Sequence, residues 1–351
     1  MDYPRRLPIP VHDGKLNVLI ARWLEEGYRS QIAVVDPRIR VFYAAEQVAA
    51  ETKRPRGPID QAPDEGADVE LDSLLREAEV IYGLRFPENI LERAPRLKWV
   101  QTSSAGVDTL VGTKLWQSDI ILTNTSGIHV IPMREHVLGM MLMFVKHAQG
   151  YFANKQDRVW EQHIPDQLCG KTLGVVGLGR IGEGIARTAK AFDMRVVAIR
   201  RHVTEQETPA AVDTLYPADK LPEMLGESDF VVVTVALTEE TRKLIGEKEL
   251  RAMKPTAYII NIARGSVIDE TALTKALKEK WIAGAGLDVF EKEPLSQDSE
   301  LWTLPNVIIT PHVAGIMRDY NARAMEVFCE NLRRYLAGES LINVIDRTRG
   351  Y

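Results

Sequence analysis

The chain lacks the features that mark several classes of protein. Only two cysteines occur among its 351 residues, Cys169 and Cys329, which excludes a disulfide framework and favours a reducing compartment. No apolar run approaches the roughly 18–20 residues of a membrane-spanning helix. The segment from Met1 to Arg6 leads into prolines instead of the apolar stretch of a signal peptide. We therefore expect a cytoplasmic protein.

An excess of basic charge is also lacking. The 44 Lys and Arg residues are outnumbered by 49 Asp and Glu residues, and the net charge is −5. This balance disfavours nucleic-acid or membrane-surface binding, so the expected partner is a small molecule. The histidines and cysteines show no spacing typical of a metal site, and we expect no metal. No internal repeats or low-complexity tracts occur.

What the sequence does contain is an alternation of short β-branched runs with segments of helical periodicity. This alternation predicts βαβ units and parallel sheets, and the length suits two domains. In the first half we expect strands over 16–21, 40–43, 80–82, 97–102 and 120–123, and helices over 24–35, 44–50, 70–78 and 87–92. Residues 51–68, rich in proline, glycine and charge, are expected to form an exposed connection.

The second half repeats this pattern more densely. We expect strands over 172–176, 195–200, 230–235, 257–261, 283–287 and 307–310, and a last helix over 318–336. A long helix is expected from Pro132 to about Gly150. Its apolar face between Val137 and Val145 fits either a dimer interface or an ordinary core.

A glycine-rich segment follows the first of these later strands. Gly177, Gly179 and Gly182 form a Gly-x-Gly-x-x-Gly pattern between a buried strand and a helical pattern. The first glycine permits a tight turn, the second a close approach to a pyrophosphate, and the third close helix–strand packing. The N–H groups at the helix start favour the negative charge of that pyrophosphate. In this context the pattern predicts a dinucleotide site.

The end of the following strand indicates which dinucleotide is bound. An acidic residue there would bind the ribose 2′-hydroxyl of NAD(H). This chain has Arg200 and Arg201 at that place, and guanidinium groups suit a 2′-phosphate. The sequence therefore favours NADP(H). NAD(H) stays open, because both arginines could be solvated beside a ribose bound by other groups.

Three further segments place polar residues directly after buried strands, at 260–269, 283–294 and 309–315. Open α/β sheets bind ligands beyond the carboxyl ends of their strands, so these segments are candidates for chemistry.

With these segments, residues 168–316 resemble the cofactor domain of the D-isomer-specific 2-hydroxyacid dehydrogenases. The matching motifs stand in the family's order: Gly-Leu-Gly-Arg-Ile-Gly at 177–182, Asn-Ile-Ala-Arg-Gly at 261–265, Gly-Leu-Asp-Val-Phe at 286–290 and Thr-Pro-His-Val-Ala-Gly at 310–315. The resemblance implies an α/β protein of two doubly wound domains. A Rossmann cofactor domain, 126–318, would be inserted in a flavodoxin-like substrate domain, 1–125 plus 319–351. It also implies a homodimer.

The resemblance implies a catalytic trio of Arg264, Glu293 and His312. The chemistry of these residues agrees: an imidazolium can deliver a proton near neutral pH, a carboxylate can orient it, and a guanidinium can hold a substrate carboxylate. Each residue also has an alternative role. His312 could be a structural histidine, and Arg264 could form an ion pair on the surface. Glu291 could replace Glu293 as the partner of the histidine.

The resemblance also implies wider binding sets. Cofactor-binding residues would be Gly177, Gly179, Arg180, Ile181, Gly182, Arg200, Arg201, Val235, Ala236, Thr241, Ile262, Ala263, Arg264, Asp288, His312, Ala314 and Gly315. Substrate-binding residues would be Arg85, Ala105, Gly106, Arg264 and His312. Asp288 would face the nicotinamide carboxamide, or simply cap a turn.

The activity that the resemblance implies is NAD(P)H-dependent reduction of a 2-oxo acid, such as glyoxylate or hydroxypyruvate, to the D-2-hydroxy acid, with His312 as the proton donor. Two alternatives remain. One is a dinucleotide-sensing binding protein of the corepressor type, and the other is phosphite or formate oxidation on the same scaffold.

Overall fold

The computed structural model describes residues 14–53, 70–201 and 209–350, so most of the connection expected over 51–68 lies outside the described residues. The chain divides into two compact units. Unit 1 comprises Met1–Ile128 and Ile316–Tyr351, and unit 2 comprises His129–Gly315. Unit 2 is therefore inserted into the chain of unit 1.

Unit 1 is built on a five-stranded parallel sheet of order β2-β1-β3-β4-β5. Val18 of β1 pairs with both Val41 and Val80, because β1 lies between β2 and β3. This is the flavodoxin-like doubly wound order. The strands are β1 (Leu16–Ala21), β2 (Ile39–Tyr43), β3 (Val80–Gly83), β4 (Trp99–Thr102) and β5 (Ile121–Thr123).

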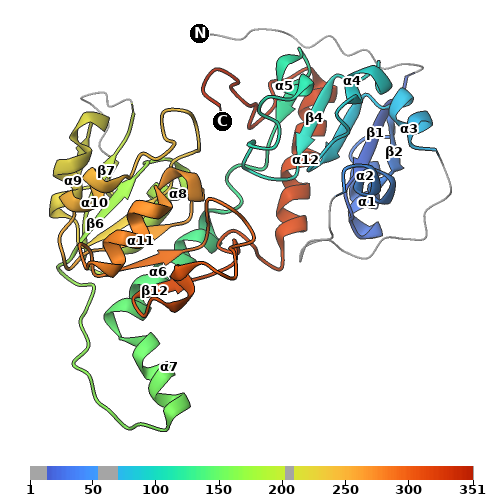
Figure 1. Cartoon of the computed structure of the whole chain (residues 1–351). Helices are drawn as coiled ribbons and strands as arrows, with labels where there is room; N and C mark the ends of the chain where they lie inside the picture. Colours follow the sequence, from blue (N-terminus) through green and yellow to red (C-terminus); the bar gives the residue numbers. More distant parts are fainter. Residues whose placement is uncertain (1–13, 54–69, 202–208, 351) are drawn as a thin grey trace. The chain divides into compact units, whose positions relative to one another are not determined.

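Helices cover both faces of this sheet. On one face, α1 (Glu26–Ala33) and the long α12 (Tyr320–Ala337) pack on a core that includes Trp99 and Phe328. Figure 1 shows α12, in red, lying along the sheet of unit 1. The other face carries α2 (Ala45–Glu51), α3 (Leu71–Glu77), α4 (Ile90–Arg93) and α5 (Lys114–Gln117).

Unit 2 is built on a seven-stranded parallel sheet of order β12-β11-β10-β9-β6-β7-β8. The first strand in the chain, β6, lies between β7 and β9, so the connections wind outwards in both directions, which is the Rossmann arrangement. The strands are β6 (Thr172–Val176), β7 (Arg195–Ile199), β8 (Thr214–Tyr216), β9 (Phe230–Val233), β10 (Tyr258–Asn261), β11 (Gly284–Leu287) and β12 (Val307–Ile309).

Two separate cores flank this sheet, because successive residues of a strand point to opposite faces. Val175 packs under α6 (Val130–Val145) and α8 (Arg180–Lys190), and Val176 packs on the other side. The helices of that other side are α9 (Leu221–Glu227), α10 (Glu247–Ala252) and α11 (Glu270–Lys278). Three short 3₁₀ turns are η1 (Ala218–Lys220), η2 (Gly265–Val267) and η3 (Glu300–Thr303).

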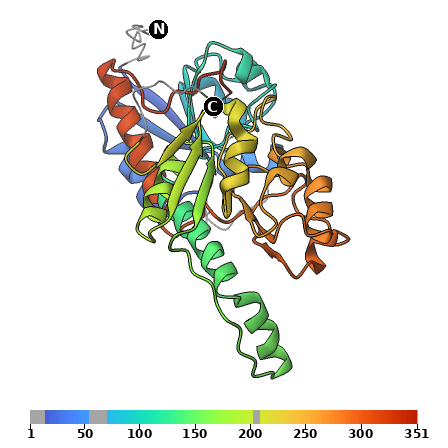
Figure 2. The same cartoon turned by 90° about the vertical axis from the view of Figure 1, so that its left-hand side faces the viewer.

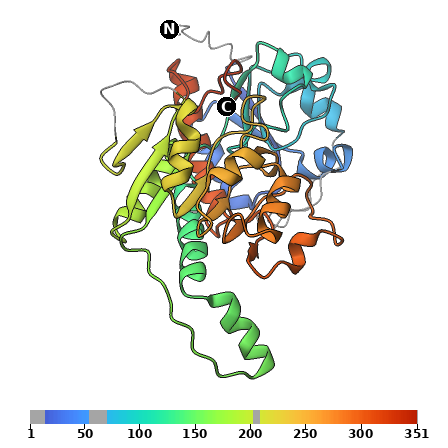
Figure 3. The same cartoon turned by 60° about the vertical axis from the view of Figure 1, so that its left-hand side comes forward.

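The long helix expected to reach Gly150 is interrupted. It ends at Val145, His147 has a φ of 53°, and a second helix, α7, runs over Ala148–Asp157. The apolar face of α6 is core: Val137, Met140, Met141, Phe144 and Val145 are all buried within unit 2. None of the residues of α7, all of which the structure describes, is buried. Figures 2 and 3 show α7 extending away from the sheet of unit 2.

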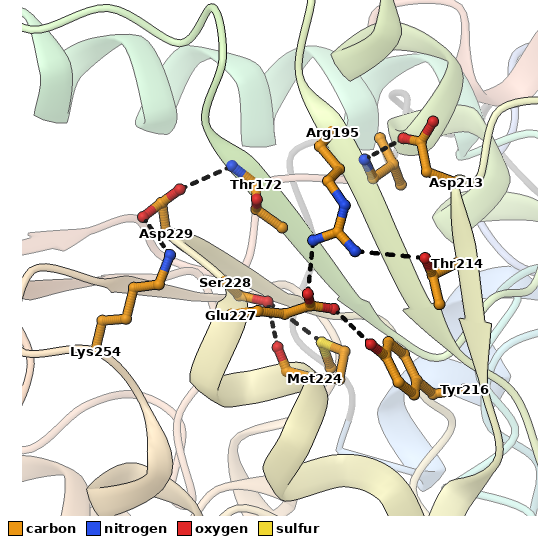
Figure 4. A network of polar contacts seen from close by, with 11 residues as sticks. Thr172, Arg195, Asp213, Thr214, Tyr216, Met224, Glu227, Ser228, Asp229 and Lys254 are labelled. Atoms are coloured by element: carbon orange, nitrogen blue, oxygen red, sulfur yellow. Dashed lines mark hydrogen bonds and ion pairs between the residues drawn. The ribbon is translucent and has the colours of Figure 1, made fainter.

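A network of polar contacts holds the amino ends of the strands of unit 2 (Figure 4). Asp229 accepts hydrogen bonds from the backbone N–H of Thr172 and from the Lys254 ammonium, both at 2.8 Å. Glu227 accepts from Arg195 at 2.6 Å and from the Tyr216 hydroxyl at 2.8 Å. Thr172 and Arg195 begin β6 and β7, so this network lies at the edge of the sheet opposite the carboxyl ends of its strands.

Among the described helices, none is both long and apolar enough to span a bilayer.

Candidate active site

The glycine-rich turn joins β6 directly to α8. Gly177 has a φ of 102°, and a Cβ added there would lie 2.6 Å from Val235 Cγ1. A Cβ at Gly182 would lie 2.5 Å from the Gly177 carbonyl oxygen. At Gly179, by contrast, such an atom would meet no described heavy atom within 4 Å. The first and third glycines are thus required for packing, and the second leaves an open backbone face at the start of α8. This geometry fits a pyrophosphate.

The segment that follows β9 lies against this turn. The Thr234 hydroxyl donates to the Gly177 carbonyl at 2.6 Å. Further along, the Thr241 hydroxyl donates to the Ala236 carbonyl at 2.6 Å and closes a compact loop. The sequence-predicted cofactor residues Val235, Ala236 and Thr241 therefore belong to one loop beside the glycine-rich turn.

The two arginines predicted to select the dinucleotide follow β7 and are both exposed. The Arg201 guanidinium lies 2.7 Å from the Glu240 carboxylate. Glu240 belongs to the loop after β9, and the sequence pattern did not single it out. Arg200 presents its side chain to solvent at the same edge.

His312 and Glu293 are in direct contact. His312 Nδ1 lies 2.7 Å from Glu293 Oε2, and Glu293 Oε1 accepts a hydrogen bond from the Phe290 backbone N–H at 3.1 Å. Glu291 instead uses its backbone N–H to donate to the Glu270 carboxylate at 3.0 Å. Burial favours a raised pKa for Glu293, but the hydrogen bond and charge of His312, the Phe290 N–H and the charge of Arg264 together lower it. Glu293 is therefore a carboxylate near neutral pH.

The backbone of His312 has an unusual conformation. Its φ is 54°, in the left-handed region that residues other than glycine seldom adopt. The His312 N–H donates to the Asp288 carbonyl at 2.8 Å, which holds the turn in place. Such strained positions persist where the surroundings fix them, and they cluster at functional sites.

Asp288 fixes the loop that carries His312. Its side chain is almost fully buried, and its carboxylate accepts hydrogen bonds from the Thr310 hydroxyl at 2.5 Å and from the N–H groups of Val313 and Ala314, both at 2.9 Å. This geometry matches the turn-capping alternative for Asp288. His136 of α6 extends the network, since its Nε2 lies 3.1 Å from the Thr310 hydroxyl. Burial lowers the pKa of His136. The negative charge of Asp288 acts in the opposite direction and raises it, but the effect of burial is larger.

Arg264 is half-buried after β10, in a loop that Asn261 supports. The Asn261 side chain donates to the Arg264 carbonyl and accepts from the Ala263 N–H, both at 3.0 Å. Gly265 packs so tightly that an added Cβ would lie 1.8 Å from the Phe290 carbonyl carbon. The loops that carry Arg264 and Glu293 are therefore in close contact.

His129, which sequence reasoning did not single out, lies at the start of α6 beside this cluster. A Cβ on Gly315 would be 2.9 Å from its ring. Burial and the positive charge of Arg264 lower its pKa to about 4. In the sequence, His129 stands just before an apolar helix, and nothing there indicates its contact with Gly315.

The predicted substrate residues Arg85, Ala105 and Gly106 belong to unit 1, where they follow β3 and β4. Arg85 is exposed, and the other two are half-buried. Fully buried Arg22 supports the start of the 103–106 loop by donating to the Ser103 hydroxyl at 2.9 Å. The Tyr320 hydroxyl donates to the Ser103 carbonyl at 2.8 Å.

Over the residues that the structure describes, no group of three or more His, Cys, Asp or Glu side chains could hold a metal ion.

A Rossmann unit with an open glycine-rich turn and an Arg, His and Glu cluster at the same sheet edge defines an oxidoreductase that uses a nicotinamide dinucleotide. Residues 138–314 match the model of the NAD-binding domain of the D-isomer-specific 2-hydroxyacid dehydrogenases. The chain belongs to this family.

Individual relatives agree with this assignment. A glyoxylate reductase of Pyrococcus furiosus is 38% identical over 264 residues, which cover 73% of this chain and 77% of that protein. A solved family member from Aeromonas salmonicida is 30% identical with a TM-score of 0.80, covering 95% of this chain and 99% of that one. An NADPH-dependent glyoxylate/hydroxypyruvate reductase of Sinorhizobium meliloti, solved with NADP and sulfate, is 26% identical with a TM-score of 0.78, covering 96% and 100%.

Proposed function

We propose that this protein reduces a small 2-oxo acid, of the glyoxylate or hydroxypyruvate type, to the D-2-hydroxy acid. Unit 2 is the cofactor domain and unit 1 the substrate domain of this enzyme, which works in the cytoplasm. The observation that carries the proposal is the 2.7 Å contact between His312 and Glu293 beside the charge of Arg264. The names of the relatives, glyoxylate reductases above all, support this substrate class.

In this mechanism the chain's residues bind the substrate and move one proton. A reduced nicotinamide, when bound, would supply the hydride for the carbonyl carbon of the substrate. His312 donates a proton from Nε2 to the carbonyl oxygen, so that the C=O bond becomes H–C–O–H. Glu293 holds the ring through Nδ1 and stabilises its charged form. Arg264 binds the substrate carboxylate and stabilises the negative charge that develops on the carbonyl oxygen. We also propose that the N–H groups of Ala105 and Gly106, in unit 1, take part in binding the substrate.

The proposed cofactor is NADP(H) in preference to NAD(H). Gly177, Gly179 and Gly182 shape the turn for its pyrophosphate, and Arg180 and Ile181 supply the first N–H groups of α8. Arg200 and Arg201 provide positive charge at the end of β7, where a 2′-phosphate would be bound. Five further residues would line the bound dinucleotide: Val235, Ala236, Thr241, Ile262 and Ala263. Ala314 and Gly315, in the capped 310–315 loop, would contribute to the same site.

We also propose that the enzyme is a homodimer. On α6, Met141 and Val145 are buried in the core, whereas Leu138 and Leu142 are only partly buried, so this helix stays a candidate for part of the interface. The supporting observation is the exposed apolar set on α7 and the segment that follows: Phe152, Val159, Trp160 and Ile164. Exposed large apolar side chains of this density mark an interaction surface.

The test measures initial rates of NADPH and NADH oxidation by the purified protein against a panel of 2-oxo acids. His312→Ala is assayed in parallel, together with dinucleotide binding by nucleotide fluorescence. We expect turnover that favours NADPH and falls about 10²–10⁴-fold in the variant, while binding persists. Phosphite and formate are offered with the oxidised dinucleotides in the same assay.

Three outcomes would contradict parts of this proposal. Rapid oxidation of phosphite or formate without 2-oxo acid turnover would replace the substrate class. Tight dinucleotide binding without turnover of any substrate would favour the sensor function. A preference for NADH with the same loss in His312→Ala would overturn only the role of the two arginines.

A further inference from the structure

The structure brings a carboxylate to the place where the dinucleotide fingerprint lacks one. In NAD(H)-binding Rossmann domains an acidic residue at the end of the second strand binds the ribose hydroxyls and repels a 2′-phosphate. This chain has Arg200 and Arg201 there. Glu240, from a loop 39 residues further along the chain, lies with a carboxylate oxygen 2.7 Å from Arg201 Nη2.

The positions of the strands show what this ion pair spans. In the sheet of unit 2, β6 lies between β7 and β9. Arg201 follows β7 and Glu240 follows β9, so the pair connects the segments on either side of β6, whose own carboxyl end is the glycine-rich turn. The loop of Glu240 is anchored to that turn, because Val235 packs on Gly177 and Thr234 donates to the Gly177 carbonyl.

We propose that Glu240 weakens the preference of this enzyme for NADP(H), by competing with the 2′-phosphate of NADP(H) for Arg201. With NAD(H) bound, the same carboxylate keeps its ion pair and can accept a hydrogen bond from a ribose hydroxyl. Arg200 and Arg201 alone would favour NADP(H) over NAD(H). Competition by Glu240 makes this difference in affinity smaller. This inference rests on the proposed role of Arg200 and Arg201.

The exposure of both groups makes the competition modest and reversible. The Arg201 side chain is 38% exposed and that of Glu240 is 73% exposed. An ion pair so accessible to water contributes little to stability, so a phosphate can displace the carboxylate at small cost. Arg200 stays available to the phosphate in either state. The expected change on removing the Glu240 charge is therefore about three- to tenfold in NADPH affinity.

The chain offers a matched control in the neighbouring residue. Glu239 carries the same charge in the same loop, and its side chain is 91% exposed, but it lies 3.8 Å from Arg242 instead of contacting Arg201. A general effect of loop charge would act on both positions. A specific contact with Arg201 acts on Glu240 alone.

The experiment measures equilibrium dissociation constants of NADPH and NADH for the full-length protein and for Glu240→Gln, Glu239→Gln, Arg201→Gln and the Arg201→Gln/Glu240→Gln double variant. The fragments 2′,5′-ADP and 5′-AMP are titrated by calorimetry, so that the result does not depend on turnover. We expect Glu240→Gln to tighten NADPH and 2′,5′-ADP about three- to tenfold, with NADH and 5′-AMP unchanged or slightly weakened. Glu239→Gln should keep the wild-type ratio of NADPH to NADH affinity. The tighter NADPH binding of Glu240→Gln should disappear in the double variant that also lacks Arg201.

Two failures are distinguishable. If Arg201→Gln weakens NADPH selectively but Glu240→Gln leaves the NADPH-to-NADH ratio unchanged, the role of Glu240 is overturned and the role of the arginine stands. If neither variant changes the ratio, the 2′-phosphate is bound elsewhere, and both proposals fall. An equal gain in Glu239→Gln would also overturn the inference, because it would show a general charge effect.

Discussion

At the scale of single residues, the proposed chemistry depends on the 2.7 Å contact between His312 and Glu293. The carboxylate binds Nδ1 and leaves Nε2 as the nitrogen that can face a substrate. Because the His312 contact, the Phe290 N–H and the Arg264 charge keep the pKa of Glu293 low despite burial, this carboxylate stays charged near neutral pH.

Replacement of Glu293 tests this assignment. We expect Glu293→Gln to lower kcat by about a hundredfold, because an amide neither stabilises imidazolium nor fixes the ring as firmly. Dinucleotide affinity should be unchanged in a fluorescence titration. Glu291→Gln is the matched control, since Glu291 is two residues away and its carboxylate lies 4.0 Å from the Lys243 ammonium instead of on His312. Equal losses in both variants would count against a specific role for Glu293.

A second residue-scale prediction concerns His129 and pH. Its pKa is 6.5 when unfolded and about 4 in the folded protein. Above pH 6.5 neither state binds the proton. Between pH 6.5 and 4 only the unfolded chain does, so the free energy of unfolding falls as the pH falls, by about 3 kcal/mol at most.

Urea unfolding at pH 7 and pH 5 measures this effect. His129→Gln should lose less stability than the wild type between these two pH values. Identical pH dependence in His129→Gln and the wild type would show that His129 does not titrate in this way.

At this scale, motifs named the candidate site residues, and the structure shows which of them lie in contact. Arg264, Glu293 and His312 follow strands within recognisable motifs, and the choice between Glu291 and Glu293 as the histidine's partner needed the backbone path that brings Glu293 Oε2 to His312. Sequence reasoning gave His129, His136 and Glu240 no role in the candidate site. Their contacts arise from segments distant in sequence, to Gly315, Thr310 and Arg201.

At the scale of elements, the close packing of η2 against the segment after β11 holds two catalytic loops together. A Cβ at Gly265 would overlap the Phe290 backbone, which is not free to move like a flexible side chain. Any substitution there must shift one loop relative to the other.

We therefore expect Gly265→Ala to destabilise unit 2 by about 1–3 kcal/mol or more and to abolish most reductase activity. Gly139→Ala in α6 is the control, because a Cβ there meets no described heavy atom within 4 Å. It should be neutral or stabilising by up to about 1 kcal/mol. Thermal unfolding and steady-state kinetics on both variants decide the matter. Normal activity in Gly265→Ala would show that the two loops tolerate separation.

The elements themselves were largely predictable, since buried parallel strands give continuous β-branched runs such as 230–233. Several features were missed for physical reasons, among them the one-turn helix α5, the strand β8 and the break in the long helix. The three-residue strand β8 is too short to show a period. The helix break after Val145 follows from the left-handed conformation of His147, and its flanking residues, Lys146 and His147, do not by themselves exclude a helix.

At the scale of the whole molecule, the exposed apolar residues of α7 and the segment after it bear on assembly. Trp160 is 92% exposed and Ile164 is 94% exposed. We expect Trp160→Ser/Ile164→Ser to convert a dimer into a monomer in light scattering coupled to gel filtration. Val34→Ser, at an exposed apolar residue of unit 1, should leave the dimer intact. A wild-type monomer would contradict the proposed assembly, and a dimeric double variant would place the interface elsewhere.

The doubly wound organisation as a whole followed from the alternation of strand and helix patterns, because each parallel connection needs a crossover helix. The insertion of unit 2 could not be derived from that alternation alone. It depends on α12, whose Phe328 and Leu332 complete the core of unit 1 after the chain returns.

The polar network of Figure 4 and the dinucleotide turn occupy opposite edges of one sheet. The residues that brace the fold are consequently different from those that meet a ligand. A combinatorial library confined to residues 200–201 and 236–241 would leave the bracing ion pairs of Asp229 and Glu227 untouched. This enzyme should therefore be a tolerant starting point for directed evolution of its coenzyme, with few variants lost to misfolding.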